Sequence, residues 1–163
     1  MITQLFKKKQ KTFQLERVCD APPSAVWSAC TNADELRQWW GPDKTTVPEC
    51  SVDLRIGGEI RVVIEAGPEM GKYAGTRWPM VGQFTQIEPD RRLVYEAQST
   101  TEGEEATTTI EHTNELTLAE QDGRTLLHLH VTIHKIGPKA KMAAFGMKWG
   151  YKGQLAKLES LLS

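Results

Sequence analysis

Apolar and polar residues alternate along most of this chain, a pattern that predicts strands with one buried face. The alternation begins over residues 13–19 and predicts a first strand that ends near Asp20. It returns at Ser51 and continues to Lys135, interrupted by turn-forming pairs such as Gly57-Gly58. The later strands are predicted over residues 51–55, 59–65, 80–88, 93–99, 107–119 and 125–135, with a loop over 66–79. About six to seven strands with mostly short connections indicate one antiparallel meander.

Two short helices are predicted between the first and second strands. The first can begin at Pro23 or Ser24 without losing a needed backbone amide, and the second can be capped by Thr31 or Asn32. Gly41-Pro42 ends the second helix. The apolar residues of the two helices are Val26, Trp27, Cys30, Leu36, Trp39 and Trp40.

A long helix is predicted at the C-terminus, beginning between Gly137 and Lys141, because the apolar period changes there from two to that of a helix. One stripe on this helix consists of Ala144, Met147, Tyr151, Leu155, Leu158 and Leu162. A second apolar patch consists of Met142, Phe145 and Trp149. A helix with two apolar patches is expected to be covered on more than one side, and the concave face of the sheet is the large apolar partner available. The pattern therefore predicts an α+β fold in which a curved antiparallel sheet wraps around the C-terminal helix.

Length and charge indicate one globular domain over residues 1–163 without a polyanionic partner. The 20 basic and 21 acidic residues give a net charge of −1, which favours neither nucleic acid nor an anionic membrane. No run approaches the roughly 20 apolar residues of a membrane span. Residues 1–11, rich in lysine, are predicted to be a frayed N-terminus. The three cysteines lack metal or CxxC spacing, which suits reduced thiols in a cytoplasmic protein.

Several separated groups of residues resemble, in order, the domain shared with the activator of a heat-shock chaperone ATPase. These groups are Ala21-Pro22 with Val26-Trp27, Trp39-Trp40-Gly41-Pro42, Asp53 with Arg55 and Gly57-Gly58, Gly82-Gln83-Phe84 with Ile87-Glu88-Pro89, Leu93-Val94, and Gly150-Tyr151 with Leu155 and Leu158. The resemblance runs from about Phe13 to Leu162. It implies the helix-grip fold of the START-like, birch-pollen-allergen-like (SRPBCC) superfamily. Tyr151 stands where many relatives carry Trp. From its 163 residues, the chain is expected to lack the separate N-terminal domain of the chaperone activator.

Relatives in this superfamily mostly hold an apolar ligand between helix and sheet, and the resemblance implies the same here. Strand alternation points His112 and Asn114 into the concave side, where they could orient a ligand's carbonyl or hydroxyl group, or alternatively face water near the sheet's open end. Trp40 is expected at the cavity mouth because it ends a short helix beside a Gly-Pro loop. Gly146, Gly150 and Gly153 indicate either reserved volume or a close approach of another segment. The full expected set of ligand-binding residues is Trp40, Phe84, Tyr95, His112, Asn114, Leu129, Met147 and Tyr151.

No metal or other cofactor is expected from the sequence. His128 and His130 lie on one strand face without accompanying metal ligands, and alternation turns them away from the helix. Asp53 and Arg55 are interpreted as a surface pair, and the glycine-rich loop matches no nucleotide-binding motif.

The leading hypothesis is a binding domain, without catalytic residues, for a small hydrophobic or lipid-like molecule. One alternative is an enzyme of the polyketide cyclase or dehydratase kind, with His112 as general acid or base. The other is a chaperone-associated protein-interaction module. A homodimer is kept as an alternative to a monomer.

Overall fold

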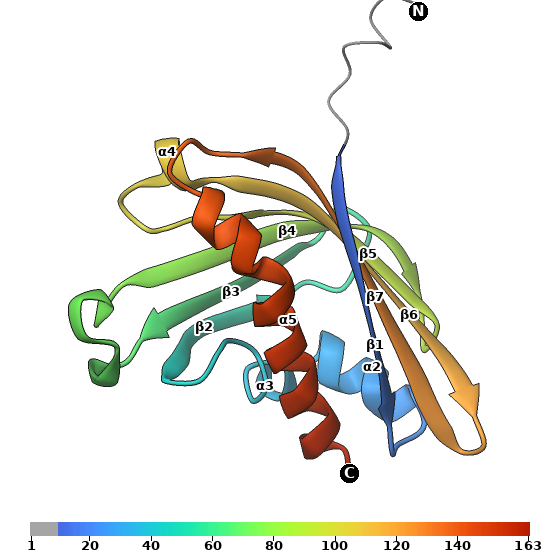
Figure 1. Ribbon diagram of the computed structural model, residues 1–163. Helices are drawn as coiled ribbons and strands as arrows, with labels where there is room; N and C mark the ends of the chain where they lie inside the picture. Colours follow the sequence, from blue (N-terminus) through green and yellow to red (C-terminus); the bar gives the residue numbers. More distant parts are fainter. Residues whose placement is uncertain (1–9) are drawn as a thin grey trace, which may run out of the picture.

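The computed structural model describes residues 10–163 as a curved seven-stranded antiparallel sheet with a long helix across its concave face (Figure 1). The strand order is β1-β7-β6-β5-β4-β3-β2. The strands are β1 (Lys11–Cys19), β2 (Thr45–Val52), β3 (Glu59–Ala66), β4 (Arg77–Glu88), β5 (Arg92–Ser99), β6 (Ile110–Gln121) and β7 (Arg124–Ile136). The helices are α2 (Pro23–Thr31), α3 (Ala33–Leu36), α4 (Glu105–Thr108) and α5 (Lys141–Leu161), with a 3₁₀ helix η1 (Pro68–Tyr73). The predicted α+β helix-grip architecture is confirmed.

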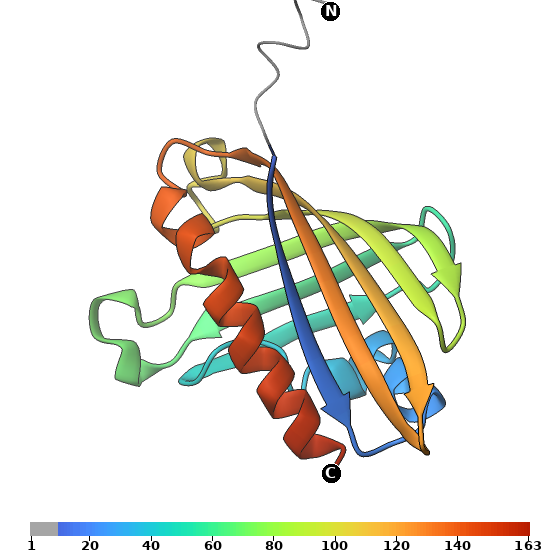
Figure 2. The same ribbon diagram turned by 45° about the vertical axis from the view of Figure 1, so that its right-hand side comes forward.

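Each neighbouring pair of strands in the sheet is antiparallel, and five of the pairs follow directly in sequence. The exception is β1, which pairs with β7 so that Lys11 faces Ile133 and Cys19 faces Thr125. Figure 2 shows β1 and β7 side by side at one side of the sheet, with α5 crossing beside them. The first and last strands of the chain are therefore neighbours in the sheet. Strand β1 forms one edge of the sheet, and β2 forms the other.

Strand alternation sets which side chains enter the core. On β7 the inward residues Leu127, Leu129, Val131 and Ile133 are all buried, as the sequence predicts. His128, His130 and His134 lie on the opposite face, where His128 bonds Gln14 and His134 bonds Thr113. His128 and His134 are therefore held by cross-strand polar contacts on the outer face.

The two short helices close one end of the sheet. Pro23 occupies the first turn of α2, and the Asn32 side chain accepts hydrogen bonds from the backbone amides of Asp34 and Glu35 at the start of α3. The Trp39 indole nitrogen donates to the carbonyl of Ala29 and so ties the two helices together. Trp40 follows directly and faces the core.

Several predicted boundaries are wrong. The second strand begins at Thr45, well before the predicted Ser51, because an edge strand with a bulge between Thr46 and Glu49 accommodates Pro48. The predicted loop over 66–79 contains η1, and β4 begins within it. The strand predicted from residue 107 begins at Ile110, after the one-turn helix α4. Lys11 was predicted to be part of a frayed N-terminus, but strand β1 already begins at this residue. Residues 1–9 of the same prediction lie outside the described residues.

Helix α5 begins at Lys141 and buries only one face. Its buried side chains are Ala144, Tyr151, Gln154, Leu155 and Leu158. Among residues 10–163 the expectation of cover on a second side is wrong, because the sheet curves around one face of α5 and leaves the other face exposed. The side chains of Met142, Phe145 and Trp149 are 83%, 81% and 67% exposed. Within residues 10–163, no helix is both long and apolar enough to cross a membrane.

Candidate functional site

An apolar pocket of about 340 Å³, here called the outer pocket, opens between the N-terminal half of α5 and strands β3 to β6. The helix contributes Met147, Gly150, Tyr151 and Gln154. The sheet contributes Ile64, Trp78, Met80, Ser99 and Ile110. Its volume falls within the range of small-molecule sites, which begins near 300 Å³.

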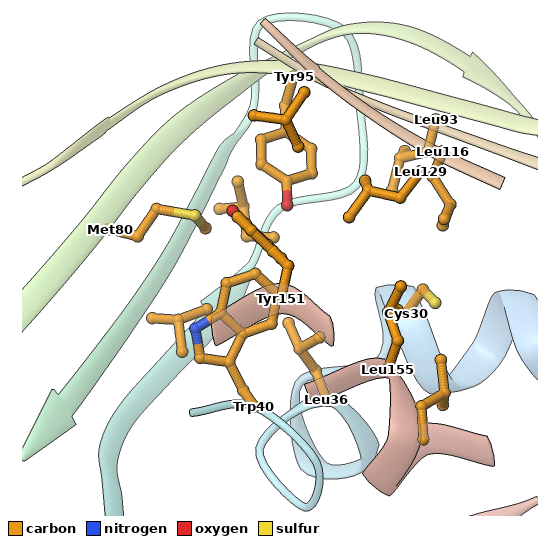
Figure 3. Close-up of a cluster of buried hydrophobic side chains, with 14 of the residues drawn as sticks. Cys30, Leu36, Trp40, Met80, Leu93, Tyr95, Leu116, Leu129, Tyr151 and Leu155 are labelled. Carbon is orange, nitrogen blue, oxygen red and sulfur yellow. The ribbon is translucent and has the colours of Figure 1, made fainter. Parts of the chain in front are cut away.

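A second, smaller space of about 30 Å³, here called the inner cavity, lies deeper beneath the helix. Its walls come from α2, α3, α5 and four strands, and several of the lining side chains are drawn in Figure 3. Trp40 and Tyr151 line both spaces, and their rings meet edge to face with centroids 6.0 Å apart. The inner cavity and the outer pocket therefore adjoin one another at these two rings.

A chain of hydrogen bonds runs from the outer pocket to the inner cavity. Ser99 Oγ lies 2.9 Å from His112 Nε2, and His112 Nδ1 lies 2.7 Å from Asn114 Oδ1. Asn114 Nδ2 donates to the hydroxyl oxygens of Tyr95 (3.0 Å) and Tyr151 (2.7 Å). His112 and Asn114 are each only 1% exposed, so the expectation that they could face water is wrong.

The direction of these bonds follows from the chemistry of each group. The Asn114 oxygen only accepts, so His112 Nδ1 carries the proton, and Nε2 accepts from the Ser99 hydroxyl. Burial lowers the pKa of His112 and so favours the neutral ring. The hydrogen bond to Asn114 raises this pKa, but its effect is smaller than that of burial. Ser99, His112 and Asn114 therefore form a neutral, fully bonded series.

Both tyrosines at the end of this series keep their phenol protons at neutral pH. Burial raises the pKa of Tyr151 to about 12 and that of Tyr95 well above its ordinary value. In Figure 3 the hydroxyl oxygens of Tyr95 and Tyr151 point toward one another near Trp40. Phe84 supports Tyr95 from the side, with ring centroids 5.9 Å apart and an interplanar angle of 84°.

Gln154 brings a second polar group to the outer pocket. Its side chain is 6% exposed, and its Oε1 atom is buried without a hydrogen-bond partner among the described residues. A buried unpaired amide oxygen is costly, so it requires an explanation such as a ligand donor.

Neither the outer pocket nor the inner cavity is lined by a charged residue of the described chain. Two larger depressions, of about 570 and 770 Å³, lie elsewhere on the surface and include charged residues such as Glu96 and Lys157. The outer pocket therefore suits an uncharged apolar molecule best.

The structure brings together most of the predicted ligand-binding residues. Tyr95, Asn114 and Leu129 line the inner cavity, Met147 lines the outer pocket, and Trp40 and Tyr151 line both. Phe84 and His112 line neither space. Phe84 packs against Tyr95, and His112 is hydrogen-bonded to Asn114, so each contacts a residue that does line the inner cavity.

Sequence reasoning missed Ser99 and Gln154. Ser99 follows Leu93, Tyr95 and Ala97 on the inward face of β5, so strand alternation alone would have placed it there. Gln154 lies three residues after Tyr151 and four before Leu158, on the buried stripe of α5. A polar residue within an apolar stripe was the available signal.

Between residues 10 and 163, no group of three or more metal-ligating side chains comes together. Cys19 and Cys30 are buried and Cys50 is half-buried, and all three are free thiols whose pKa is raised by burial. Asp53 and Arg55 pair at 2.8 Å on the surface, as predicted.

Comparison with known proteins identifies a family. The family model described as "Activator of Hsp90 ATPase homolog 1-like protein" matches residues 20–163. A search of the curated proteins found no match.

Solved structures share the fold along nearly the whole chain. A Mycobacterium smegmatis protein has a TM-score of 0.75 at 19% identity, covering 96% of both chains. A Chromobacterium violaceum protein has a TM-score of 0.72 at 21% identity, covering 93% of this chain and 96% of its own. A Rhodobacter sphaeroides protein has a TM-score of 0.71 at 25% identity, covering 94% of this chain and 96% of its own.

Proposed function

The chain belongs to the Activator of Hsp90 ATPase homolog 1-like family, and we propose that within this family it is a binding protein for a small apolar molecule held in the outer pocket. The fold is consistent with ligand binding and with chaperone-associated roles. The observation that carries the proposal is the outer pocket itself, which combines apolar walls, sufficient volume and a buried, unpaired amide oxygen on Gln154.

The sequence of α5 supports a space kept open for a ligand. A Cβ atom built at Gly146, Gly150 or Gly153 would meet nothing within 4 Å, so none of these glycines serves a close approach of another segment. Of the three, only Gly150 lines the outer pocket, and Met147 stands one turn before it. A flexible thioether beside an open volume adapts to ligands of varied shape.

The enzyme alternative receives less support from the geometry. His112 lines neither the outer pocket nor the inner cavity, although it borders the depression of about 570 Å³ that includes Glu96. A ligand in the outer pocket or inner cavity would therefore exchange protons with His112 only through Ser99 or Asn114. A chaperone-associated role would use the outer surface and would be independent of the outer pocket.

Binding is tested by titrating the protein with an environment-sensitive apolar dye and repeating the titration with Met147→Trp. The larger indole would occupy the outer pocket, and we expect dye affinity to fall about tenfold or more, a loss of about 1.4 kcal/mol. Lys148→Trp is the matched control, because it adds the same indole on the exposed neighbouring position.

The Lys148→Trp protein should bind the dye as the parent protein does, and both variants should unfold cooperatively. Equal dye affinity in all three proteins would contradict a binding site in the outer pocket. Native mass spectrometry of the freshly purified protein provides an independent readout, since a retained small molecule would identify the ligand class.

A further inference from the structure

We infer that Tyr95 and Tyr151 form a paired hydrogen-bond donor for one oxygen atom of the bound molecule, so that the protein selects apolar molecules carrying a neutral carbonyl group. This inference rests on the proposed function and specifies the ligand class. The carbonyl oxygen would enter the inner cavity while the apolar body occupies the outer pocket.

The first argument is the unused hydrogen on each phenol. Each hydroxyl oxygen accepts a hydrogen bond from Asn114 Nδ2, which uses both amide hydrogens. Neither phenol hydrogen has an acceptor among residues 10–163, although both side chains are buried. Two buried donors that share one anchoring amide and lie against one small cavity are complementary to a single acceptor oxygen.

The second argument is the shape and charge of the space in front of the phenols. The inner cavity of about 30 Å³ has room for one or two water-sized groups, which is enough for a carbonyl oxygen and not for a ring or chain. Tyr151 borders both spaces, so a ligand in the outer pocket lies against the same side chain that presents the donor. No charged residue lines either space, and a buried carboxylate would lack a counter-ion, so a neutral carbonyl is favoured over an acid.

The third argument concerns what holds the donors in place. His112 donates from Nδ1 to Asn114 Oδ1 and thereby fixes which end of the amide faces the tyrosines. Ser99 in turn bonds Nε2 of the same ring. His112 and Ser99 are thus positioning residues, and the His112 tautomer reports the orientation of Asn114.

The test compares three probes of similar size, 2-acetylnaphthalene, 2-ethylnaphthalene and 2-naphthoate, by fluorescence or calorimetric titration. The measured quantity is the ratio of ketone to hydrocarbon affinity in each protein, because differences in aqueous solubility cancel between variants. We expect Tyr151→Phe and Tyr95→Phe each to lower this ratio by about threefold to tenfold, the size of one net hydrogen bond. Hydrocarbon affinity should remain unchanged, which also verifies that the variants fold.

Tyr73→Phe is the matched control, since Tyr73 is the remaining tyrosine and lies half-exposed in η1, away from both spaces. It should leave the ratio unchanged. The naphthoate should bind more weakly than the ketone in the parent protein.

The outcomes separate the two proposals. Failure of both the ketone and the hydrocarbon to bind would contradict the proposed function and this inference together. Binding of both with a ratio unaffected by either Tyr→Phe change would overturn the inference alone. Nitrogen-15 chemical shifts of the His112 ring give a second readout. Protonation at Nδ1 supports the inference, whereas protonation at Nε2 means that Asn114 is turned over and accepts both phenol hydrogens, which would overturn it.

Discussion

His112 is the titratable residue whose burial has the clearest consequence for stability. Its side chain is almost fully enclosed, and desolvation lowers its pKa in the folded protein below the ordinary value of 6.5. The unfolded chain therefore takes up a proton at a higher pH than the folded protein does. The neutral His112 ring therefore contributes to the free energy of unfolding above about pH 6.5. This contribution is lost as the pH falls through and below that value.

We expect the free energy of unfolding of the parent protein to fall more than that of His112→Gln between about pH 7.5 and about pH 5.5. The difference between the two proteins should change by no more than about 1.4 kcal/mol per pH unit, the limit for one proton. Urea unfolding at several pH values measures this quantity. Parallel pH dependences for the two proteins would show that His112 protonates equally well in the folded state.

The sequence places individual side chains on a face but does not bring them together. Alternation on β6 correctly predicts that His112 and Asn114 point inward. The meeting of Asn114 with Tyr95 and Tyr151 depends on how two strands and a helix are spaced, and no local pattern encodes that spacing. This is also why His112 was predicted on a wall that Asn114 in fact forms.

Helix α5 offers a direct comparison of a buried and an exposed apolar side chain. Leu158 is fully buried, whereas the Phe145 side chain is largely exposed. We expect Leu158→Ala to lower the free energy of unfolding by about 2–5 kcal/mol. Phe145→Ala should change it by less than about 0.5 kcal/mol.

Denaturant unfolding of the two variants decides between one packed face and two. A large loss of stability in Phe145→Ala would mean that its side chain is covered in solution. An unchanged midpoint in Leu158→Ala would contradict the packing of α5 on the sheet.

The existence of most helices and strands could be predicted because each follows a local period or cap. Boundaries were less predictable where the tertiary position overrides the local signal. Pro48 looks like a loop residue but is tolerated in β2 because that strand is an edge. The apolar patch of Met142, Phe145 and Trp149 looks like a second buried face, yet whether such a patch is covered depends on neighbours that sequence periodicity does not specify.

The whole molecule is closed by contacts between distant parts of the chain. Strand β7 lies between β1 and β6, so the core face of β1 is completed only when the last strand is present. Helix α5 then covers the concave side and also contacts β1. Such long-range pairing is expected to make folding slower than in a helical protein of similar size.

The pairing of β1 with β7 has a consequence for the nascent chain on the ribosome. Strand β1 is synthesised first among the described elements and must wait, unpaired on both edges, until residues 124–136 emerge. We expect nascent chains exposed only as far as Gln121 to be cleaved readily by a protease, and chains exposed through Leu161 to resist it. Limited proteolysis of stalled ribosome complexes measures this directly. A protease-resistant core in the shorter chains would show that β2 to β6 fold without β7 and α5. The expected result would instead mean that the chain folds only once β7 and α5 have been synthesised.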